Sequence, residues 1–205
     1  YWTLFLFVKG SHGIEEVTHP EQAFSAGKAF GHFQKQLSDF PGHLLTDTIP
    51  GFHNGKGRLA QFQTAIAEDK AGRVAAMKPV IDALLSRAGE MTQLQEWLDS
   101  GILPLRVTHN DTKINNVLYD DQNQILCIID LDTVMPGTAL FDFGDAIRTL
   151  GNTASEDEAD LGKIGFNGDY YRSFTEGYLS ESREFLTEKE IQNLAFSCRY
   201  LVWEQ

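Results

Sequence analysis

The chain has 205 residues, enough for one domain of moderate size with a substantial apolar core. Its 29 acidic and 17 basic residues give a formal net charge of −12, which argues against general nucleic-acid binding because that binding depends on positive charge. Only two cysteines, no apolar run of about 18 residues and no signal peptide at the start predict a protein of the cytoplasm without a membrane partner.

The first elements in chain order are a strand and a helix. Residues 1–8 are rich in aromatic and β-branched side chains, which predicts a strand. Thr18 and Glu21 have the spacing of a capping box, so we expect a long helix to begin at Thr18. Its apolar stripe is expected at positions 24, 27, 30, 33 and 37.

The rest of the chain is mainly helical in pattern. Further helices are expected at residues 58–68, 74–88 and 91–98. A second capping box, Thr187 and Glu190, predicts another long helix with one buried face near the end of the chain.

Short β-rich runs interrupt the helical pattern in the middle of the chain. Residues 117–119 and 125–129 are two such runs, and the turn residues 120–123 lie between them. They predict a hairpin that brings Asp130 back beside the residues that precede the first run.

The most informative segment precedes this hairpin. It reads His109-Asn110-Asp111-Thr112-Lys113-Ile114-Asn115-Asn116, and Asp130-Leu131-Asp132 follows fourteen residues later. Phosphoryl transfer from a nucleotide needs a carboxylate near the attacking hydroxyl, and an amide and a second carboxylate to hold Mg²⁺ against the phosphates. The pattern H-x-D-x-x-x-x-N therefore predicts a kinase-type catalytic loop. The competing interpretation is a surface turn whose Asn and Asp satisfy local backbone groups.

Residues 103–149 resemble the aminoglycoside phosphotransferase and choline kinase superfamily. Within it, residues 108–113 and 132–137 are most similar to the N-acetylhexosamine 1-kinases, which phosphorylate amino sugars at the anomeric hydroxyl. The resemblance implies an α+β, protein-kinase-like fold with a mostly helical C-terminal lobe, in which a small β-hairpin carries the catalytic loop. It also implies ATP and Mg²⁺ as cofactors and a small-molecule substrate, with an amino sugar as the first choice.

The resemblance also implies a division of the chain into lobes. Residues 1–9 correspond to the last strand of the N-terminal lobe and the hinge behind adenine, where Phe7 and Val8 would border the nucleotide. Residues 10–205 correspond to the C-terminal lobe. The glycine-rich loop and strand lysine of the N-terminal lobe are missing, so the chain alone is expected to be inactive.

Roles for individual residues follow from the same resemblance. Asp111 corresponds to the catalytic base beside the substrate hydroxyl, and Lys113 to a lysine that touches the transferred phosphate. Asn116 and Asp130 correspond to the Mg²⁺ ligands, and Asp132 to an acceptor for a sugar hydroxyl.

Two further residues are expected to support the loop. The ring of His109 would pack and hydrogen-bond behind the metal carboxylate. Asp142-Phe143-Gly144 spells the DFG of protein kinases, but Asp130 already stands where the metal ligand is needed. The resemblance makes Asp142 a brace for the catalytic loop, and an N-cap for a helix over residues 143–150 is an equally open interpretation.

Other functions remain open at this point. An aminoglycoside or choline kinase would use the same residues. A protein kinase is disfavoured because only eleven residues separate Asp130 from Asp142. A phosphatase of the haloacid dehalogenase type would use Asp130 as a nucleophile and Asp132 as a general acid, on a parallel sheet with helices on both faces. A non-catalytic kinase-like lobe is the last alternative.

Overall fold

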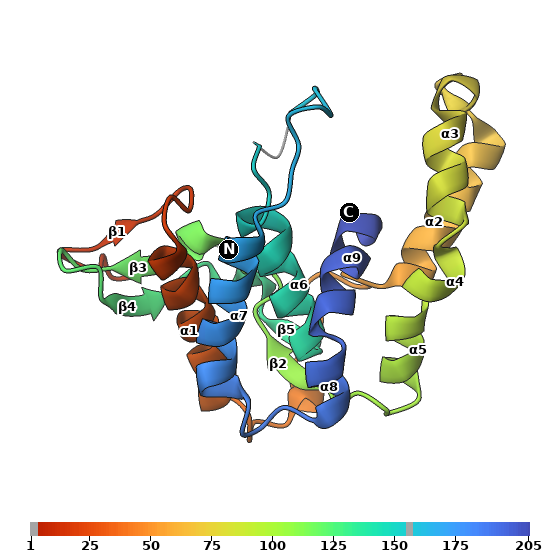
Figure 1. The fold of residues 1–205 in the computed structure, drawn as a ribbon. Coiled ribbons are helices and arrows are strands. Elements are labelled where there is room, and N and C mark those ends of the chain that lie inside the picture. Colours follow the sequence, from red (N-terminus) through yellow and green to blue (C-terminus); the bar gives the residue numbers. More distant parts are fainter. Residues whose placement is uncertain (1–3, 155–157) are drawn as a thin grey trace.

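The computed structural model describes residues 4–154 and 158–205 (Figure 1). The helices are α1 (Pro20–Gln36), α2 (Gly55–Glu68), α3 (Val74–Leu85), α4 (Ala88–Met91), α5 (Gln93–Asp99), α6 (Ala139–Leu150), α7 (Gly168–Ser182), α8 (Glu188–Gln192) and α9 (Leu194–Glu204). The strands are β1 (His12–Gly13), β2 (Arg106–Thr108), β3 (Val117–Tyr119), β4 (Ile125–Ile128) and β5 (Met135–Gly137). Three short 3₁₀ turns are η1 (Gly42–Leu44), η2 (Ile114–Asn116) and η3 (Leu131–Thr133). The expected mostly helical α+β architecture is confirmed.

Helices α1, α6, α7 and α9 form the centre of the molecule. In Figure 1, α1 and α7 lie side by side, whereas α2 and α3 project from the other side as a hairpin. The aromatic rings of Phe30, Phe143 and Phe174 are buried among these central helices. α1 and α7 come unusually close because glycines face the opposing backbone: a Cβ at Gly31 would lie 2.6 Å from the carbonyl oxygen of Tyr178.

The strands form two small antiparallel sheets. One has the order β1-β3-β4, in which Val117 is opposite Ile128, and the other pairs β2 with β5. The expected hairpin is therefore confirmed. Every strand pair in the described part of the chain is antiparallel, so the parallel sheet of the phosphatase interpretation is wrong.

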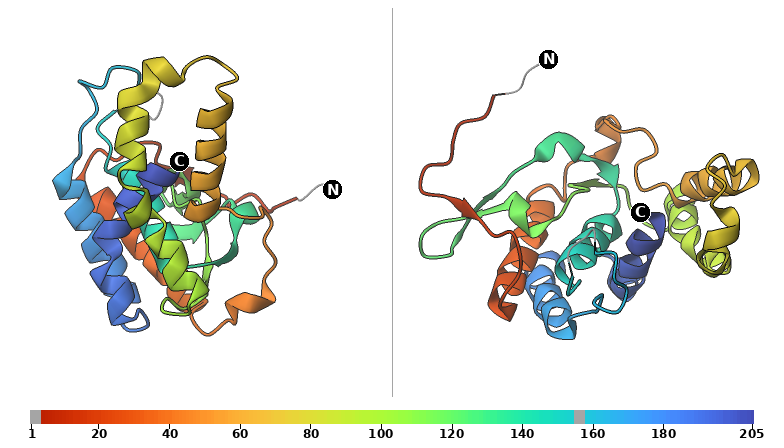
Figure 2. Two further views of the ribbon diagram at one scale, coloured as in Figure 1. Left: turned by 90° about the vertical axis from the view of Figure 1, so that its right-hand side faces the viewer. Right: turned by 90° about the horizontal axis from the view of Figure 1, so that it is seen from above.

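The strand predicted at residues 1–8 is not found in the part of this segment that the structure describes. Residues 1–3 lie outside the described residues, and residues 4–8 are not in a strand. Figure 2 shows this part of the chain extending away from the lobe. A strand needs a neighbour for its backbone hydrogen bonds, and no described strand lies beside these residues.

The first long helix begins later than its capping pattern predicted. α1 begins at Pro20, with His19 as N-cap, because proline is well suited to the first helical position. Gln22, and not Glu21, completes the capping box: its Oε1 accepts from the backbone N–H of His19 at 3.2 Å. The buried face is shifted accordingly, and its members are Ala23, Ala26, Gly27, Ala29, Phe30, Gly31 and Gln34.

The later helices agree better with the sequence patterns that predicted them. The capping box of Thr187 and Glu190 is confirmed, but the helix breaks at Asn193 into the short α8 and the longer α9. The helices expected at 58–68 and 74–88 are α2 and α3, whereas the one at 91–98 is divided between α4 and α5. None of the helices in the described ranges combines the length and the apolar character needed to cross a membrane.

Candidate active site

The loop predicted to be catalytic, residues 109–116, leaves β2 after Thr108 and reaches β3 through η2. Asn110 has a left-handed backbone (φ 64°), and its Nδ2 donates to the carbonyl oxygen of Thr133 at 2.9 Å. The Thr133 hydroxyl donates in return to the carbonyl oxygen of His109 at 2.7 Å. These two bonds attach the loop to the segment after the hairpin, so the two motifs seen in the sequence lie together in space.

Asp111 stands at the centre of this assembly. Its Oδ2 accepts a hydrogen bond from Asn116 Nδ2 at 3.2 Å, and its Oδ1 lies 4.0 Å from Lys113 Nζ. Its side chain keeps 30% of its surface exposed, so the carboxylate is open to solvent. The carboxylate is therefore accessible, oriented by an amide and close to a cation.

Asn116 and Asp130 have the donor set that Mg²⁺ prefers. Both hydrogen bonds of the Asn116 side chain to described residues are donated by Nδ2, which leaves its Oδ1 available as a ligand. The Ile129 N–H donates to the backbone carbonyl of Asn116 at 2.9 Å, and Asp130 is the next residue after this pairing. Asp130 is exposed, has φ 59° and makes no hydrogen bond to a described residue through its carboxylate. An amide oxygen and an unpaired carboxylate suit a hard cation that also binds phosphate oxygens and water.

The predicted metal ligands include only one carboxylate, that of Asp130. Within residues 4–154 and 158–205, no three His, Cys, Asp or Glu side chains are grouped so that they could hold a metal ion. One carboxylate and one amide are nevertheless consistent with Mg²⁺ that is bound mainly through substrate phosphates.

Two other predicted site regions are exposed. Asp132 lies in η3, two residues after Asp130, and its backbone oxygen accepts from the Thr48 hydroxyl at 3.1 Å. Phe7 is 85% exposed, and Val8 is half-buried next to Ser11, whose hydroxyl donates to the Val8 carbonyl at 2.7 Å. The structure brings Thr133, the residue after Asp132, into contact with the catalytic loop. Among the described residues, no hydrogen bond or ion pair joins Phe7 or Val8 to Asp111.

Asp142 lies behind the loop, in the first turn of α6. The N-cap of α6 is Thr138, so the interpretation of Asp142 as an N-cap is wrong. Its carboxylate accepts from the backbone N–H of His109 at 3.0 Å and of Asn110 at 2.8 Å. Burial raises the pKa of Asp142, while these hydrogen bonds act in the opposite direction. One buried side chain thus holds the two peptide units that precede Asp111.

The His109 ring uses both of its nitrogens. Nε2 lies 2.9 Å from the Ile129 carbonyl oxygen, and Nδ1 accepts from the Asp111 N–H at 3.3 Å. A carbonyl can only accept, so the proton is on Nε2. The rings of Phe30 and Phe33 pack edge-on against it. The imidazole therefore spans from Asp111 to the residue before Asp130.

Sequence reasoning missed several residues that hold the loop from behind. Asp145 Oδ2 accepts from the Thr112 N–H at 2.8 Å, and the Thr112 hydroxyl donates to the Asp142 carbonyl at 2.6 Å. Gln34 Nε2 donates to Asp142 Oδ2 at 2.7 Å. Gln34 is 2% exposed on the buried face of α1, and a polar residue within an apolar stripe is the signal that could have revealed it.

A second buried group contacts the loop from the opposite side. His53 Nδ1 lies 2.9 Å from Glu204 Oε2, and its Nε2 lies 3.4 Å from the Asn110 carbonyl oxygen. Arg58 Nε donates to the other oxygen of Glu204 at 2.7 Å. Burial raises the pKa of Glu204, but the hydrogen bonds from His53 and Arg58 outweigh it and lower the pKa below its ordinary value.

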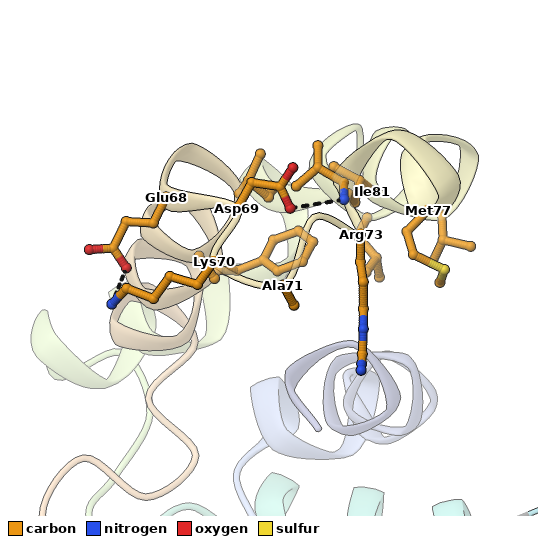
Figure 3. A pocket seen from close by; sticks show the side chains of 13 residues that line it. Glu68, Asp69, Lys70, Ala71, Arg73, Met77 and Ile81 are labelled. Atoms are coloured by element: carbon orange, nitrogen blue, oxygen red, sulfur yellow. Dashed lines mark hydrogen bonds and ion pairs between the residues drawn. The ribbon is translucent and has the colours of Figure 1, made fainter.

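A hollow of about 400 Å³ lies elsewhere, between α2 and α3 (Figure 3). Apolar side chains such as Phe62, Ile66 and Met77 line it, and Glu68 and Lys70 form an ion pair at its edge. None of its lining residues belongs to the catalytic loop. It is separate from the site built by Asp111 and Asp130.

Comparison with known proteins identifies the family of this chain. The model of the phosphotransferase enzyme family known as APH matches residues 1–176. The chain belongs to this family.

Solved structures show the same relationship at the level of the fold. An ethanolamine kinase from Plasmodium vivax aligns with 99% of this chain and 58% of its own, at 14% identity and a TM-score of 0.53. A choline kinase from Cryptosporidium parvum Iowa II aligns with 95% of this chain and 61% of its own, at 16% identity and a TM-score of 0.51. An aminoglycoside-3′-phosphotransferase of type VIII aligns with 91% and 63%, at 19% identity and a TM-score of 0.47.

The two kinases establish that this APH-family chain has a kinase-like fold. The chain spans about three fifths of the length of these solved structures. The activity and the substrate of the whole protein are therefore matters for proposal.

Proposed function

We propose that the protein is an ATP-dependent phosphotransferase acting on a small-molecule hydroxyl, and that the acceptor is the anomeric hydroxyl of an N-acetylhexosamine. One observation carries the phosphotransferase assignment. The accessible Asp111 carboxylate is hydrogen-bonded to Asn116, and the hairpin bonds the backbone of Ile129, the residue before Asp130, to the Asn116 carbonyl. This grouping supplies a proton acceptor and cation ligands in one place.

Asp111 is proposed to accept the proton of the attacking hydroxyl as that oxygen bonds to the terminal phosphorus of ATP. Its Oδ2 is held by Asn116 Nδ2, and the proposal assigns proton acceptance to the other oxygen, Oδ1. Lys113, 38% exposed, would contact the oxygens of the transferred phosphate. Asn116 Oδ1 and the Asp130 carboxylate would hold Mg²⁺, which when bound neutralises charge on the phosphate oxygens.

The nucleotide is proposed to lie between residues 10–205, as the C-terminal lobe, and an N-terminal lobe that ends with residues 1–9. Phe7 and Val8 would border the adenine, and the exposure of Phe7 is compatible with a surface that a base covers. The glycine-rich loop and the strand lysine would belong to that lobe. We place the protein in the cytoplasm, where ATP and Mg²⁺ are abundant.

The sugar assignment rests on the resemblance of residues 108–113 and 132–137 to the 1-kinases, and Asp132 is the proposed partner of a sugar hydroxyl. The exposed carboxylates of Asp130 and Asp132, together with the net charge of −12, also suit a cationic acceptor. An aminoglycoside or choline kinase is therefore the second candidate. It shares the chemistry at Asp111 and differs only in the acceptor.

Steady-state kinetics of the complete protein that carries these 205 residues tests the proposal. Asp111→Asn keeps the size of the side chain but removes its basicity, so kcat should fall by about 10²–10⁴-fold. The KM for ATP should change little because Asp111 faces the acceptor. Asp121→Asn, the same change at an exposed position of the hairpin turn, is the matched control and should leave kcat unchanged.

The acceptors to compare are N-acetylated hexosamines, choline and an aminoglycoside. Turnover of choline or an aminoglycoside without turnover of any sugar would replace the first candidate with the second. An Asp111→Asn variant that keeps most of its kcat would remove Asp111 as the base.

A further inference from the structure

A buried chain of polar groups connects α7 with the catalytic loop through α1. The hydroxyl of Tyr178 on α7 donates to Oε1 of Gln34 on α1, and Gln34 Nε2 donates to Asp142 Oδ2 at 2.7 Å. Tyr178 is fully buried, and Gln34 and Asp142 are only 2% and 1% exposed. Buried polar side chains without a hydrogen-bond partner are costly, so each member of this chain depends on the next.

The direction of the donors determines how Gln34 is oriented. Burial raises the pKa of Tyr178 well above its ordinary value, and the negative charges of Asp142 and Glu190 add to this effect. The phenol therefore stays protonated and donates to Oε1 of the amide. Since Oε1 is occupied, the amide presents its Nε2 to Asp142.

Close helix packing holds the two side chains in register. A Cβ at Gly27 would lie 2.9 Å from the backbone nitrogen of Tyr178, and one at Gly31 would lie 2.6 Å from the Tyr178 carbonyl oxygen. Both glycines let α1 approach the turn of α7 that carries Tyr178. Gln34 lies one turn after Gly31, which brings its amide within reach of the phenol.

The carboxylate of Asp142 connects Gln34 to the loop by hydrogen bonds. Its Oδ2 accepts from both Gln34 and the His109 N–H, and its Oδ1 accepts from the Asn110 N–H. Asn110 has a left-handed backbone, which places the next residue, Asp111, at the site. A rotation of the Asp142 carboxyl would therefore change the direction of the peptide that precedes Asp111.

We propose that Gln34 and Tyr178 are positioning residues: acting through the carboxylate of Asp142, they hold the backbone at His109 and Asn110 and thereby aim Asp111 at the acceptor. The proposal rests on the proposed phosphotransferase function. The rate of the reaction would then depend on Gln34 of α1 and Tyr178 of α7, which are buried and contact neither substrate nor nucleotide.

Two variants of the complete protein test this. Gln34→Leu keeps a similar volume but removes the donor to Asp142, and Tyr178→Phe removes only the hydroxyl that orients the amide. We expect kcat to fall about tenfold in the first and several-fold in the second, with the KM values of both substrates little changed. The control is Ser197→Ala, which removes a buried hydroxyl that donates within α9 to the Leu194 carbonyl. It should leave kcat at the wild-type value.

A readout that needs no activity accompanies the kinetics. Amide hydrogen exchange at His109 and Asn110 should be faster in Gln34→Leu than in wild type or in Ser197→Ala, because Asp142 is less well held. Unchanged exchange at both amides, or a wild-type kcat in Gln34→Leu, would overturn the proposal.

The two proposals can fail separately. If the wild-type protein phosphorylates none of the acceptors, the proposed function fails, and the exchange rates alone decide whether Gln34 holds the loop. If Gln34→Leu does not fold, Tyr178→Phe decides by the same two measurements, because it loses only one oxygen atom.

Discussion

Replacement of glycine by alanine is expected to change the stability of the protein differently at two positions of α7, because only one of them contacts α1. Gly177 lies in the middle of α7, against the backbone of α1. A Cβ at this position would overlap the carbonyl oxygen of Phe24 and lie 3.1 Å from the backbone nitrogen of Lys28. Gly168 is the first residue of the same helix, and a Cβ there would meet nothing within 4 Å.

The expected magnitude follows from two opposing terms. Alanine is favoured over glycine inside a helix by about 1 kcal/mol. At Gly177 the obstacle is backbone, which cannot rotate away, so the helices must separate, and overpacking of this kind costs about 3 kcal/mol. The net expectation is that Gly177→Ala lowers the free energy of unfolding by about 2 kcal/mol. Gly168→Ala should leave it unchanged or raise it by up to about 1 kcal/mol.

Urea unfolding of the complete protein measures both values. Gly177→Ala should also lower kcat, because it displaces the helix turn that carries Tyr178 away from Gln34. If Gly177→Ala were as stable as Gly168→Ala, the close approach of α1 and α7 would be wrong. The argument for the orientation of Gln34 would then lose its basis.

Two further predictions concern other parts of the site. The pKa of Glu204 is lower in the folded protein than its ordinary 4.5, so its carboxylate stabilises the fold above that pH and the contribution is lost as the pH falls below it. Glu204→Gln should therefore lower the free energy of unfolding at neutral pH, and the difference from wild type should shrink in urea titrations carried out below about pH 4.5. Asp130→Asn keeps the shape of the side chain but removes its charge, so titration with Mg²⁺ should show a higher metal requirement and a much lower kcat. Near-normal rates at the same Mg²⁺ concentration would contradict the ligand assignment.

The local patterns that were predicted correctly are those whose physical cause lies within a few residues. The hairpin at β3 and β4 follows from two β-rich runs separated by turn residues, and the capping box of Thr187 and Glu190 forms between groups three positions apart. The grouping of Asp111 with Asn116 is also local, since they are five positions apart. In each case the residues that interact are close neighbours in the chain.

The errors in local structure came from competition between neighbouring signals. Thr18 and Glu21 matched a capping box, but Pro20 determined the first helical position and Gln22 supplied the cap. Residues 4–8 have strand composition, but a strand forms only where another strand accepts its hydrogen bonds.

The sequence by itself determined which carboxylates and amides stand at kinase spacing, and which short elements carry them. Only the tertiary structure decided what holds them in place. Gln34, Asp142 and Tyr178 lie on three different helices, and Gln34 and Asp142 are 108 positions apart. A hydrogen bond across such a separation depends on how whole helices pack. Here that packing depends on glycines that face the backbone of the opposing helix, and the sequence does not show which backbone lies opposite them.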